Sequence, residues 1–535
     1  MLITNTFLID DKFDFMCDEY SNALVASWLG QDYDMMFAES LLVNWDDEED
    51  FLLERVIDDD WNMYECLERY HGIKVGDQTG ISRLKSTGGI IAFIRQEIAR
   101  NYPVWICFNM KEVACFSEVD RRWESGMNVA IIVGIDGERA DQEQFVYFRP
   151  IHFHDKYTQI LSMSLEEAQA SIVSVRKYEH TTVFMSHKPT NLDLGNFLRK
   201  VAEQFEDRKI HNKLERFTNH FIKAVDYESI FHRVEQRGLK HLPLIYNLSV
   251  LYRSRVLFSF CLSYLAVLKG SSVVQDFADE MAVNGGRFYT IRGMILKIFF
   301  YKELSINDNE RIIGYLNKVI AAEKDLMERL KRFEGQGKPS LINPICNSMG
   351  EEEPIYHAEL TPYFNNKALS DVLSKDSSAN FDGIGGYFLG EQYPYGKMII
   401  SGRMSFLIAD KESANDNISC REQAIAVKPG NYGSLMILAS SCHGSFKDYL
   451  TLVYENQESE QLLMVSSSFW YPKAHFSEAT AWQGRYAMLI NDDYYIEQRK
   501  LSIYAKEYPL DRSGKLVEII LPDCPDIHVF ALSLQ

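Results

Sequence analysis

At 535 residues, the chain is too long for one hydrophobic core, so two or three domains are expected. Hydrophobic residues make up 46% and charged residues 25%, an ordinary globular composition that excludes a disordered chain. The formal net charge of −20 argues against nucleic acid as the main partner, because phosphate binding needs a basic face.

Three features bear on the compartment. The N-terminal stretch is acidic and has no basic segment before an apolar core, so no secretory signal is expected. The apolar run at 256–268 is too short to cross a bilayer and follows two arginines, which favours a buried helix and no membrane contact. Nine cysteines without a CxxC pair indicate neither a disulfide framework nor a zinc site. We therefore expect a reduced, cytoplasmic protein with no metal or cofactor.

The first predicted element is a helix behind Cys17. Apolar residues recur at helical spacing over 18–29, and Gly30 lies where a C-terminal cap belongs. A cysteine at a helix N-terminus can be a stabilised thiolate, so Cys17 is a candidate nucleophile. Asp18 and Glu19 in the first turn oppose this, and a small buried cysteine is the alternative.

Helices and strands then alternate as far as about residue 188. Apolar strands at 129–135 and 145–148, joined by a polar turn, predict a β-hairpin. Ser164 and Glu167 predict a capping box at the start of a helix.

The rest of the chain divides by its pattern. Residues 191–335 are nearly all amphipathic or apolar helix, and 336–355 form a linker rich in Gly, Pro, Ser and charge. Residues 356–535 contain short β-type runs between turns, which is typical of a β-sandwich or jelly roll.

Five stretches in the N-terminal third carry a family resemblance. They are Cys17 with Asn22 and Ala23, then 30–45, 128–136, 146–150 and 164–169. Over roughly residues 10–190 the chain resembles the family typified by the N-terminal domain of the butirosin biosynthesis H protein. That resemblance implies a bacterial papain-like domain at 1–190, akin to cysteine peptidases. We expect the helical segment at 191–335 to pack on this domain. The type member transfers an acyl group from a carrier-protein thioester to an amine, so an acyl or peptidyl carrier protein or a biosynthetic enzyme is the implied partner.

Two positions depart from that family's pattern. The family's histidine and aspartate correspond to Asn128 and Arg149, which a hairpin pairing of 134 with 144 would bring together. Asparagine does not titrate and arginine keeps its proton, so neither can be the general base. His152 and His154 lie just beyond, on one face of an extended segment. They could be a relocated base, metal ligands, or simply surface or packed residues.

The C-terminal region carries a second resemblance. Residues 381–394, 424–445 and 508–534 resemble a bacterial β-sandwich domain found beside α-fucosidase-like modules. No carboxylate pair marks a glycosidase, so a binding or assembly module is expected. Tyr387, Trp470 and Trp482 could form a sugar platform or belong to the aromatic core.

Together these features predict an α+β protein with a papain-like N-terminal domain, a helical middle segment and a C-terminal antiparallel β-sandwich (jelly roll). The expected function is association with natural-product biosynthesis of the non-ribosomal peptide or polyketide type. The N-terminal domain would be catalytically degenerate and would bind a carrier protein, peptide or enzyme partner. The alternative is a Cys17-dependent acyl or peptidyl transferase or amide hydrolase.

Overall fold

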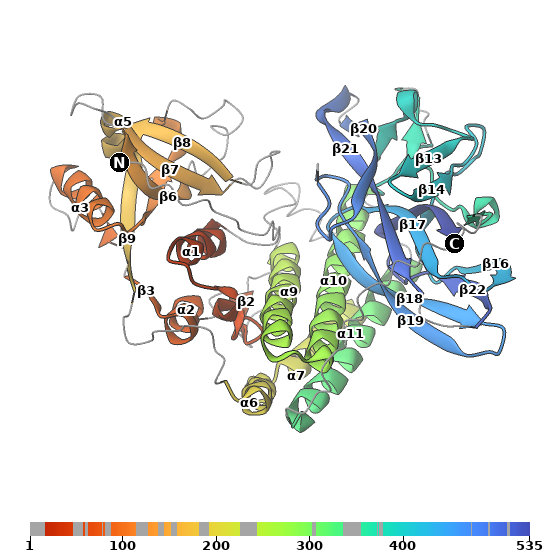
Figure 1. The fold of residues 1–535 in the computed structure, drawn as a ribbon, viewed down its shortest axis with the longest axis horizontal. Helices are drawn as coiled ribbons and strands as arrows, with labels where there is room; N and C mark the ends of the chain where they lie inside the picture. The colour runs from red at the N-terminus through yellow and green to blue at the C-terminus, as the bar shows by residue number, and fades with distance from the viewer. Residues whose placement is uncertain are drawn as a thin grey trace. The chain divides into compact units, whose positions relative to one another are not determined.

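The computed structural model (Figure 1) mixes helices and strands and ends in a β-sandwich. It describes residues 17–45, 57–58, 62–76, 79–80, 87–113, 127–136, 144–150, 158–180, 192–224, 243–301, 306–334, 355–371, 373, 378–471, 473–490, 493–510 and 514–535. The chain divides into two units. Unit 1 comprises Met1–Leu41 and Asp60–Asp193, and unit 2 comprises Leu42–Asp59 and Leu194–Gln535. The helices that we expected to pack on the N-terminal domain are thus grouped with the sandwich. Residues 336–354 of the predicted linker at 336–355 lie outside the described residues.

Unit 1 is built on an antiparallel sheet of order β3-β9-β5-β6-β7-β8, with β4 also paired to β9. Its strands are β3 (Ile73–Val75), β4 (Thr79–Gly80), β5 (Val104–Asn109), β6 (Met127–Asp136), β7 (Gln144–Pro150), β8 (Thr158–Ser164) and β9 (Ile172–His180). Its helices are α1 (Cys17–Trp28), α2 (Met63–His71), α3 (Thr87–Ala99) and α5 (Leu165–Ser171), with 3₁₀ turns η1 (Asp34–Phe37) and η3 (Met110–Glu112). Isoleucines of α3 pack on alternate residues of β5 and β6, as a half-buried sheet face requires.

Local signals in unit 1 act as predicted. Gly30 ends α1 in the left-handed conformation at φ +68°, which glycine adopts without a Cβ penalty. At the start of α5, the Ser164 Oγ accepts the Glu167 N–H at 3.2 Å, and the Glu167 carboxylate accepts the Ser164 N–H at 2.7 Å. The capping box is therefore confirmed. The hairpin is confirmed as well, since β6 and β7 pair antiparallel.

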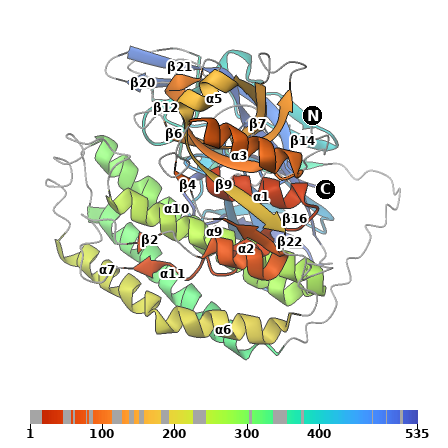
Figure 2. The same cartoon turned by 90° about the vertical axis from the view of Figure 1, so that its left-hand side faces the viewer.

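Unit 2 begins with helices. They are α6 (Leu194–Asp207), α7 (Ile210–Ala224), α9 (Pro243–Lys269), α10 (Ser272–Tyr301) and α11 (Ile306–Arg332), together with the short strands β1 (Asn44–Trp45) and β2 (Ile57–Asp58). Helices α9 and α10 lie side by side and α10 also contacts α11, while α6 and α7 contact α11 (Figure 2).

Helix α9 is longer than the apolar run that predicted it. By length and composition it could cross a membrane, but 78% of its apolar window is buried inside the protein. Arg253 and Arg255 are buried within it as well. These features match the buried core helix that we expected.

The sandwich has two main sheets. The larger sheet has the order β10-β23-β17-β21-β20-β12-β11 with β15 on β23, and the smaller has the order β16-β22-β18-β19, beside a β13–β14 hairpin. The strands are β10 (Tyr356–His357), β11 (Leu369–Ser370), β12 (Gly386–Leu389), β13 (Met398–Ser401), β14 (Met404–Leu407), β15 (Ile418–Ser419), β16 (Ala424–Gly430), β17 (Ser434–Ser441), β18 (Phe446–Tyr454), β19 (Ser459–Ser466), β20 (Ala479–Ile490), β21 (Asp493–Pro509), β22 (Leu516–Ile520) and β23 (Ile527–Leu534), with 3₁₀ turns η5 (Thr361–Tyr363) and η6 (Gly390–Gln392).

The larger sheet is covered on both faces. One face of β17 and β23 packs against the smaller sheet, and the other packs against the β13–β14 hairpin and aromatic residues such as Phe381. Every residue of β17 and β23 is therefore buried, which explains their nearly continuous apolar sequences. Helix α10 lies against the sandwich and contacts β18 (Figure 1).

Candidate functional site

The sequence-predicted N-terminal residues lie on three neighbouring elements of unit 1. Cys17 is the first residue of α1, and this helix contacts β6, which carries Asn128, and β7, which carries Arg149. The side chains of Cys17 and Arg149, and His152 and His154 entirely, lie outside the described residues.

The hairpin register differs from the expected one. Gly134 pairs with Val146, two residues from the expected residue 144, and a bulge between Ile132 and Gly134 reduces this offset to one residue at Ile132 and Ile131. Ile131 then pairs with Phe148, so Arg149 falls nearer Ala130 than Asn128. The Asn128 Oδ1 accepts the Val129 N–H at 2.7 Å, a local bond that a side-chain amide makes readily.

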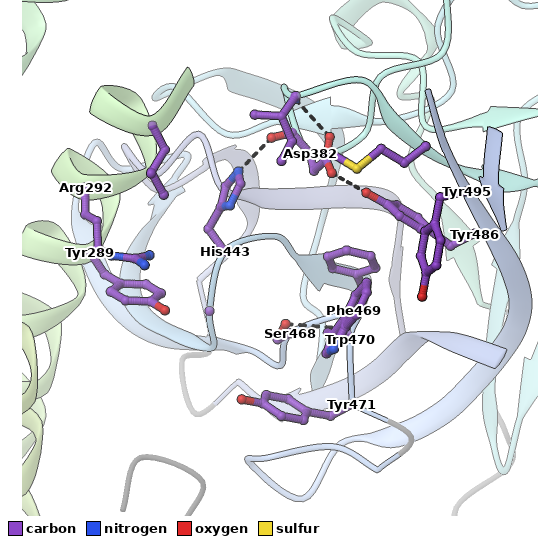
Figure 3. Close-up of a pocket in the computed structure, with 14 residues that line it drawn as sticks. Tyr289, Arg292, Asp382, His443, Ser468, Phe469, Trp470, Tyr471, Tyr486 and Tyr495 are labelled. Atoms are coloured by element: carbon purple, nitrogen blue, oxygen red, sulfur yellow. Dashed lines mark hydrogen bonds between the residues drawn. The ribbon is translucent and has the colours of Figure 1, made fainter. Parts of the chain in front are cut away.

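A pocket of about 530 Å³ lies in unit 2 between α10 and one end of the sandwich (Figure 3). Its lining is largely aromatic, with a few polar groups. The lining residues are Tyr289, Arg292, Leu296, Asp382, Ile384, His443, Gly444, Ser468, Phe469, Trp470, Tyr471, Tyr486, Met488 and Tyr495. A concave, mostly apolar site with convergent polar groups is the usual form of a small-molecule site.

Asp382 is fixed by the glycine-rich turn before β12. Its Oδ1 accepts the N–H groups of Ile384 and Gly386, each at 2.9 Å, and its Oδ2 accepts the Tyr486 hydroxyl. Burial and then Asp382 raise the pKa of Tyr486, so this hydroxyl keeps its proton and donates. At Gly386 a Cβ would lie 1.6 Å from the Tyr486 Oη, so only glycine fits there.

His443 follows β17 and has a left-handed backbone at φ +60°, a conformation that costs free energy in a residue other than glycine. Its Nε2 lies 2.7 Å from the main-chain oxygen of Asp382. Because that oxygen can only accept, Nε2 carries the proton and a neutral ring keeps a lone pair on Nδ1. Burial lowers the pKa of His443, which favours this neutral form.

Arg292 of α10 supplies positive charge to the pocket. Its guanidinium lies over the Tyr289 ring, 4.9 Å from the centroid (Figure 3). Its buried Nε has no hydrogen-bond partner, and within the described part of the chain the guanidinium contacts no carboxylate. A cation–π contact stabilises the charge only in part.

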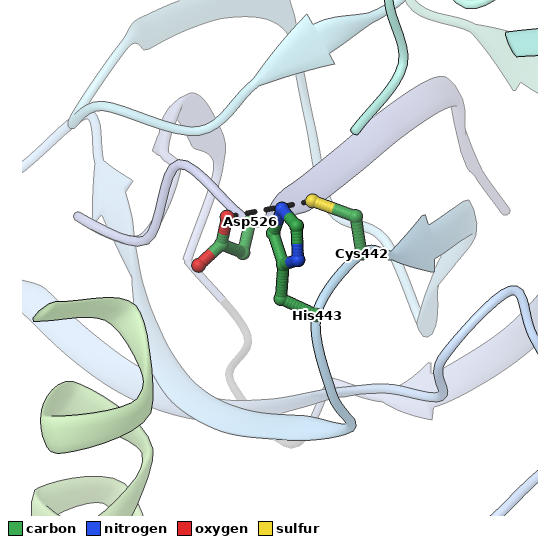
Figure 4. Close-up of side chains that lie close together, drawn as sticks. All are labelled: Cys442, His443 and Asp526. Carbon is green, nitrogen blue, oxygen red and sulfur yellow. Dashed lines mark hydrogen bonds between the residues drawn. The ribbon is translucent and has the colours of Figure 1, made fainter. Parts of the chain in front are cut away.

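A buried polar cluster adjoins the pocket through His443, which lines it, and Figure 4 shows three of the residues of this cluster, Cys442, His443 and Asp526. The Cys442 Sγ lies 3.4 Å from the Asp526 Oδ1 and 3.7 Å from the His528 Nε2. The Lys297 Nζ pairs with the same Asp526 oxygen at 3.0 Å. The His528 Nδ1 lies 2.7 Å from the Asn417 Oδ1 and can donate to it.

The cluster offers metal-type donors. One atom from each of Cys442, His443 and Asp526 lies within 4.8 Å of the other two (Figure 4). Two observations do not fit a divalent cation. The Lys297 ammonium already neutralises Asp526, and burial followed by Asp526 raises the pKa of the Cys442 thiol.

Cys442, His528 and Asn417 are also arranged like a nucleophilic triad. The Cys442 thiol lies beside the His528 imidazole, and the imidazole lies beside the Asn417 amide. Nucleophilic catalysis would need a thiolate, however. Burial and then Lys297 lower the pKa of His528 to about 3, and the pKa of Cys442 is raised. These groups are therefore a neutral buried network.

The three aromatic residues of the expected sugar platform lie in different environments and do not form one surface. Tyr387 is buried with Leu389, and Trp482 packs edge-on to Phe388. Trp470 alone of the three lines the pocket.

Sequence reasoning missed this site, although it had singled out the segments that build it. Asp382 comes from 381–394, His443 from 424–445 and Asp526 from 508–534. Their glycine and proline content indicated turns, and nothing local showed that these turns meet beside α10.

The family of the AziU2-like beta-sandwich domain matches residues 356–535. The match confirms the predicted C-terminal β-sandwich and names a different family from the α-fucosidase-associated modules that we expected. An AziU2-like domain suggests a protein associated with natural-product biosynthesis. No curated protein matches the chain. The sandwich side of the pocket lies within the matched residues, and the α10 side lies outside them.

Proposed function

We propose that this protein acts in natural-product biosynthesis by binding. Its pocket takes a small organic group that a carrier protein, peptide or partner enzyme presents. The observation that carries this proposal is the pocket of about 530 Å³ between α10 and the sandwich. That volume lies in the usual range for small-molecule sites, roughly 300–1,000 Å³.

The pocket walls are arranged before any ligand arrives. Three donors fix Asp382, and a hydrogen bond to the Asp382 main chain fixes His443. Trp470 packs edge-on to Phe469 and Tyr486. A preorganised site loses little side-chain entropy on binding, which suits a binding function.

The N-terminal domain supports binding over catalysis. If the domain is papain-like, Asn128 stands in the place of the base, and an amide cannot take a proton from Cys17. A degenerate domain of this kind can still recognise the carrier or peptide that an active relative would process.

The pocket is tested with 2-naphthamide, a neutral aromatic probe, in calorimetric titrations. Ile384→Trp fills the pocket from its glycine-rich wall and should abolish binding. The control is Ile400→Trp, the same substitution on β13, where the side chain is 72% exposed and does not line the pocket. Equal binding by the two variants would refute the proposal, as would a native protein that binds neither this probe nor its charged analogues 2-naphthoate and 2-naphthylmethylammonium.

One observation favours a second candidate, a Cys17-dependent acyl or peptidyl transferase or amide hydrolase. Cys17 begins α1, and α1 contacts the two strands that carry Asn128 and Arg149. Asn128→His with Arg149→Asp would restore the family's residue types. Thioester hydrolysis that appears in this double variant, and disappears on adding Cys17→Ser, would support this candidate.

A further inference from the structure

The charge of the pocket narrows the class of ligand. The guanidinium of Arg292 is half-buried in the pocket wall, and among the described residues no carboxylate pairs with it. The chain has 76 acidic residues against 56 Lys and Arg, so acidic groups are abundant. A buried or half-buried charge without a counter-charge costs free energy, which a ligand of opposite charge recovers.

The carboxylate of Asp382 also lines the pocket, but it forms no ion pair with Arg292. Asp382 takes two backbone N–H groups and the Tyr486 hydroxyl, so neutral donors satisfy both of its oxygens. His443 presents a lone pair on Nδ1 and carries no charge when neutral. The Arg292 guanidinium is therefore the charge in the pocket that a negatively charged ligand could pair with.

The aromatic residues of the pocket wall determine which ligand shape fits. Trp470 contacts Phe469 and Tyr486 edge-on, and the rings of Phe469 and Tyr486 are tilted by 45° to each other, so ring faces and edges bound the space (Figure 3). Aromatic walls can also cage a cation. Here Arg292 already covers the Tyr289 face and repels a second positive charge.

Resting on the proposed function, we propose that the pocket binds an anionic, planar organic group, with Arg292 pairing to its carboxylate, sulfate or phosphate. The guanidinium fork matches such oxyanions in two-point geometry. The ring system of the ligand then stacks among the aromatic walls.

The test compares three probes of similar shape by calorimetry: 2-naphthoate, 2-naphthamide and 2-naphthylmethylammonium. The native protein should bind the carboxylate about tenfold more tightly than the amide, and the ammonium most weakly. Added NaCl should weaken carboxylate binding and leave amide binding unchanged.

Variants assign the preference to one residue. Arg292→Met should remove the difference between carboxylate and amide while keeping the amide affinity, which also shows that the pocket is intact. Arg292→Lys should restore part of the difference. The control is Arg485→Met, because Arg485 is exposed, pairs with Glu391 and does not line the pocket. This control removes the same charge elsewhere and should keep the preference.

The outcomes separate the two proposals. Equal affinity for carboxylate and amide in the native protein would overturn the anion preference while leaving the binding function standing. A preference that survives Arg292→Met would overturn the assignment to Arg292. Failure of all three probes to bind would overturn both proposals.

Discussion

Arg255 of α9 and Glu323 of α11 form a two-point ion pair in the interior of unit 2. The Nε–Oε1 distance is 2.7 Å and the Nη2–Oε2 distance is 3.0 Å, and both side chains are fully buried. The Arg255 guanidinium also donates to the Ser254 Oγ and lies 5.0 Å from the Phe288 ring centroid. Each charge is satisfied only while its partner is present, so the packing of these helices depends on both.

Glu323→Leu should therefore destabilise the protein by about 3–5 kcal/mol, because it leaves a buried guanidinium without a counter-charge. Urea unfolding followed by circular dichroism measures this. The control, Glu328→Leu, removes a half-exposed carboxylate that pairs with Lys331 and Arg332 on the same helix, and it should cost less than about 1 kcal/mol. Adding Arg255→Met to Glu323→Leu should recover most of the loss. Equal costs for Glu323→Leu and Glu328→Leu would contradict this account.

Stability should fall as the pH drops below 6.5. Burial and the Lys297 charge lower the pKa of His528 to about 3, while the unfolded chain takes up the proton near pH 6.5. The unfolded state thus binds more protons, and one such histidine costs about 1.4 kcal/mol per pH unit below 6.5. Burial also lowers the pKa values of His211 and His443, which act in the same direction.

Three described carboxyls, Asp276, Asp416 and Asp448, oppose this trend, because burial raises their pKa values. Burial raises the pKa of Asp448 to about 6, so its folded form gains protons first and is favoured as the pH falls from 6 towards 3.8. These carboxyls are the same in the native protein and in His528→Gln, so a comparison of the two proteins isolates the contribution of His528. Urea unfolding at closely spaced pH values should show a shallower slope for His528→Gln than for the native protein. Identical slopes would show that His528 does not titrate as described.

The features that could be predicted from the sequence are those that a few neighbouring residues determine. The Gly30 cap, the Ser164–Glu167 capping box and the alternating strands depend on a few adjacent positions, and the structure has all of them. The hairpin pairing was wrong by one to two residues, because the bulge after Ile132 leaves no mark in the apolar pattern. The pocket could not be predicted, since Arg292 and His443 meet only when a helix packs on a distant turn.

Labelling with iodoacetamide tests whether Cys17 in unit 1 is an activated nucleophile. Among the described cysteines, Cys66, Cys261, Cys420, Cys442 and Cys524 are buried. Burial raises the pKa of Cys66 to about 12 and also raises that of Cys442, so such thiols should react slowly in the folded protein. If Cys17 is a nucleophile, one fast-labelled site should appear near neutral pH and vanish in Cys17→Ser. Identical labelling of native protein and variant would exclude an activated Cys17.

Proteolysis tests how the sandwich depends on the helices before it. The glycine- and proline-rich composition of 336–355 predicts cleavage there. The sandwich of unit 2 contacts α10 and α11 through polar bonds, with the Lys297 Nζ 3.0 Å from Asp526 and the Tyr315 hydroxyl 2.7 Å from the Asp523 Oδ1. We therefore expect the nicked pieces to co-elute in gel filtration, and the C-terminal piece to unfold once separated by urea. Asp526 is fully buried, so losing Lys297 would leave its charge uncompensated.

Lys297→Met should accordingly separate the nicked pieces at a lower urea concentration than the native protein requires. Its matched control is Lys318→Met, because Lys318 pairs with Asp523 but is 47% exposed, where water replaces the lost contact. The control should shift the separation point little. A C-terminal piece that elutes alone and melts cooperatively without urea treatment would show that the sandwich folds independently. The contacts to α10 would then contribute to the pocket and not to the stability of the sandwich.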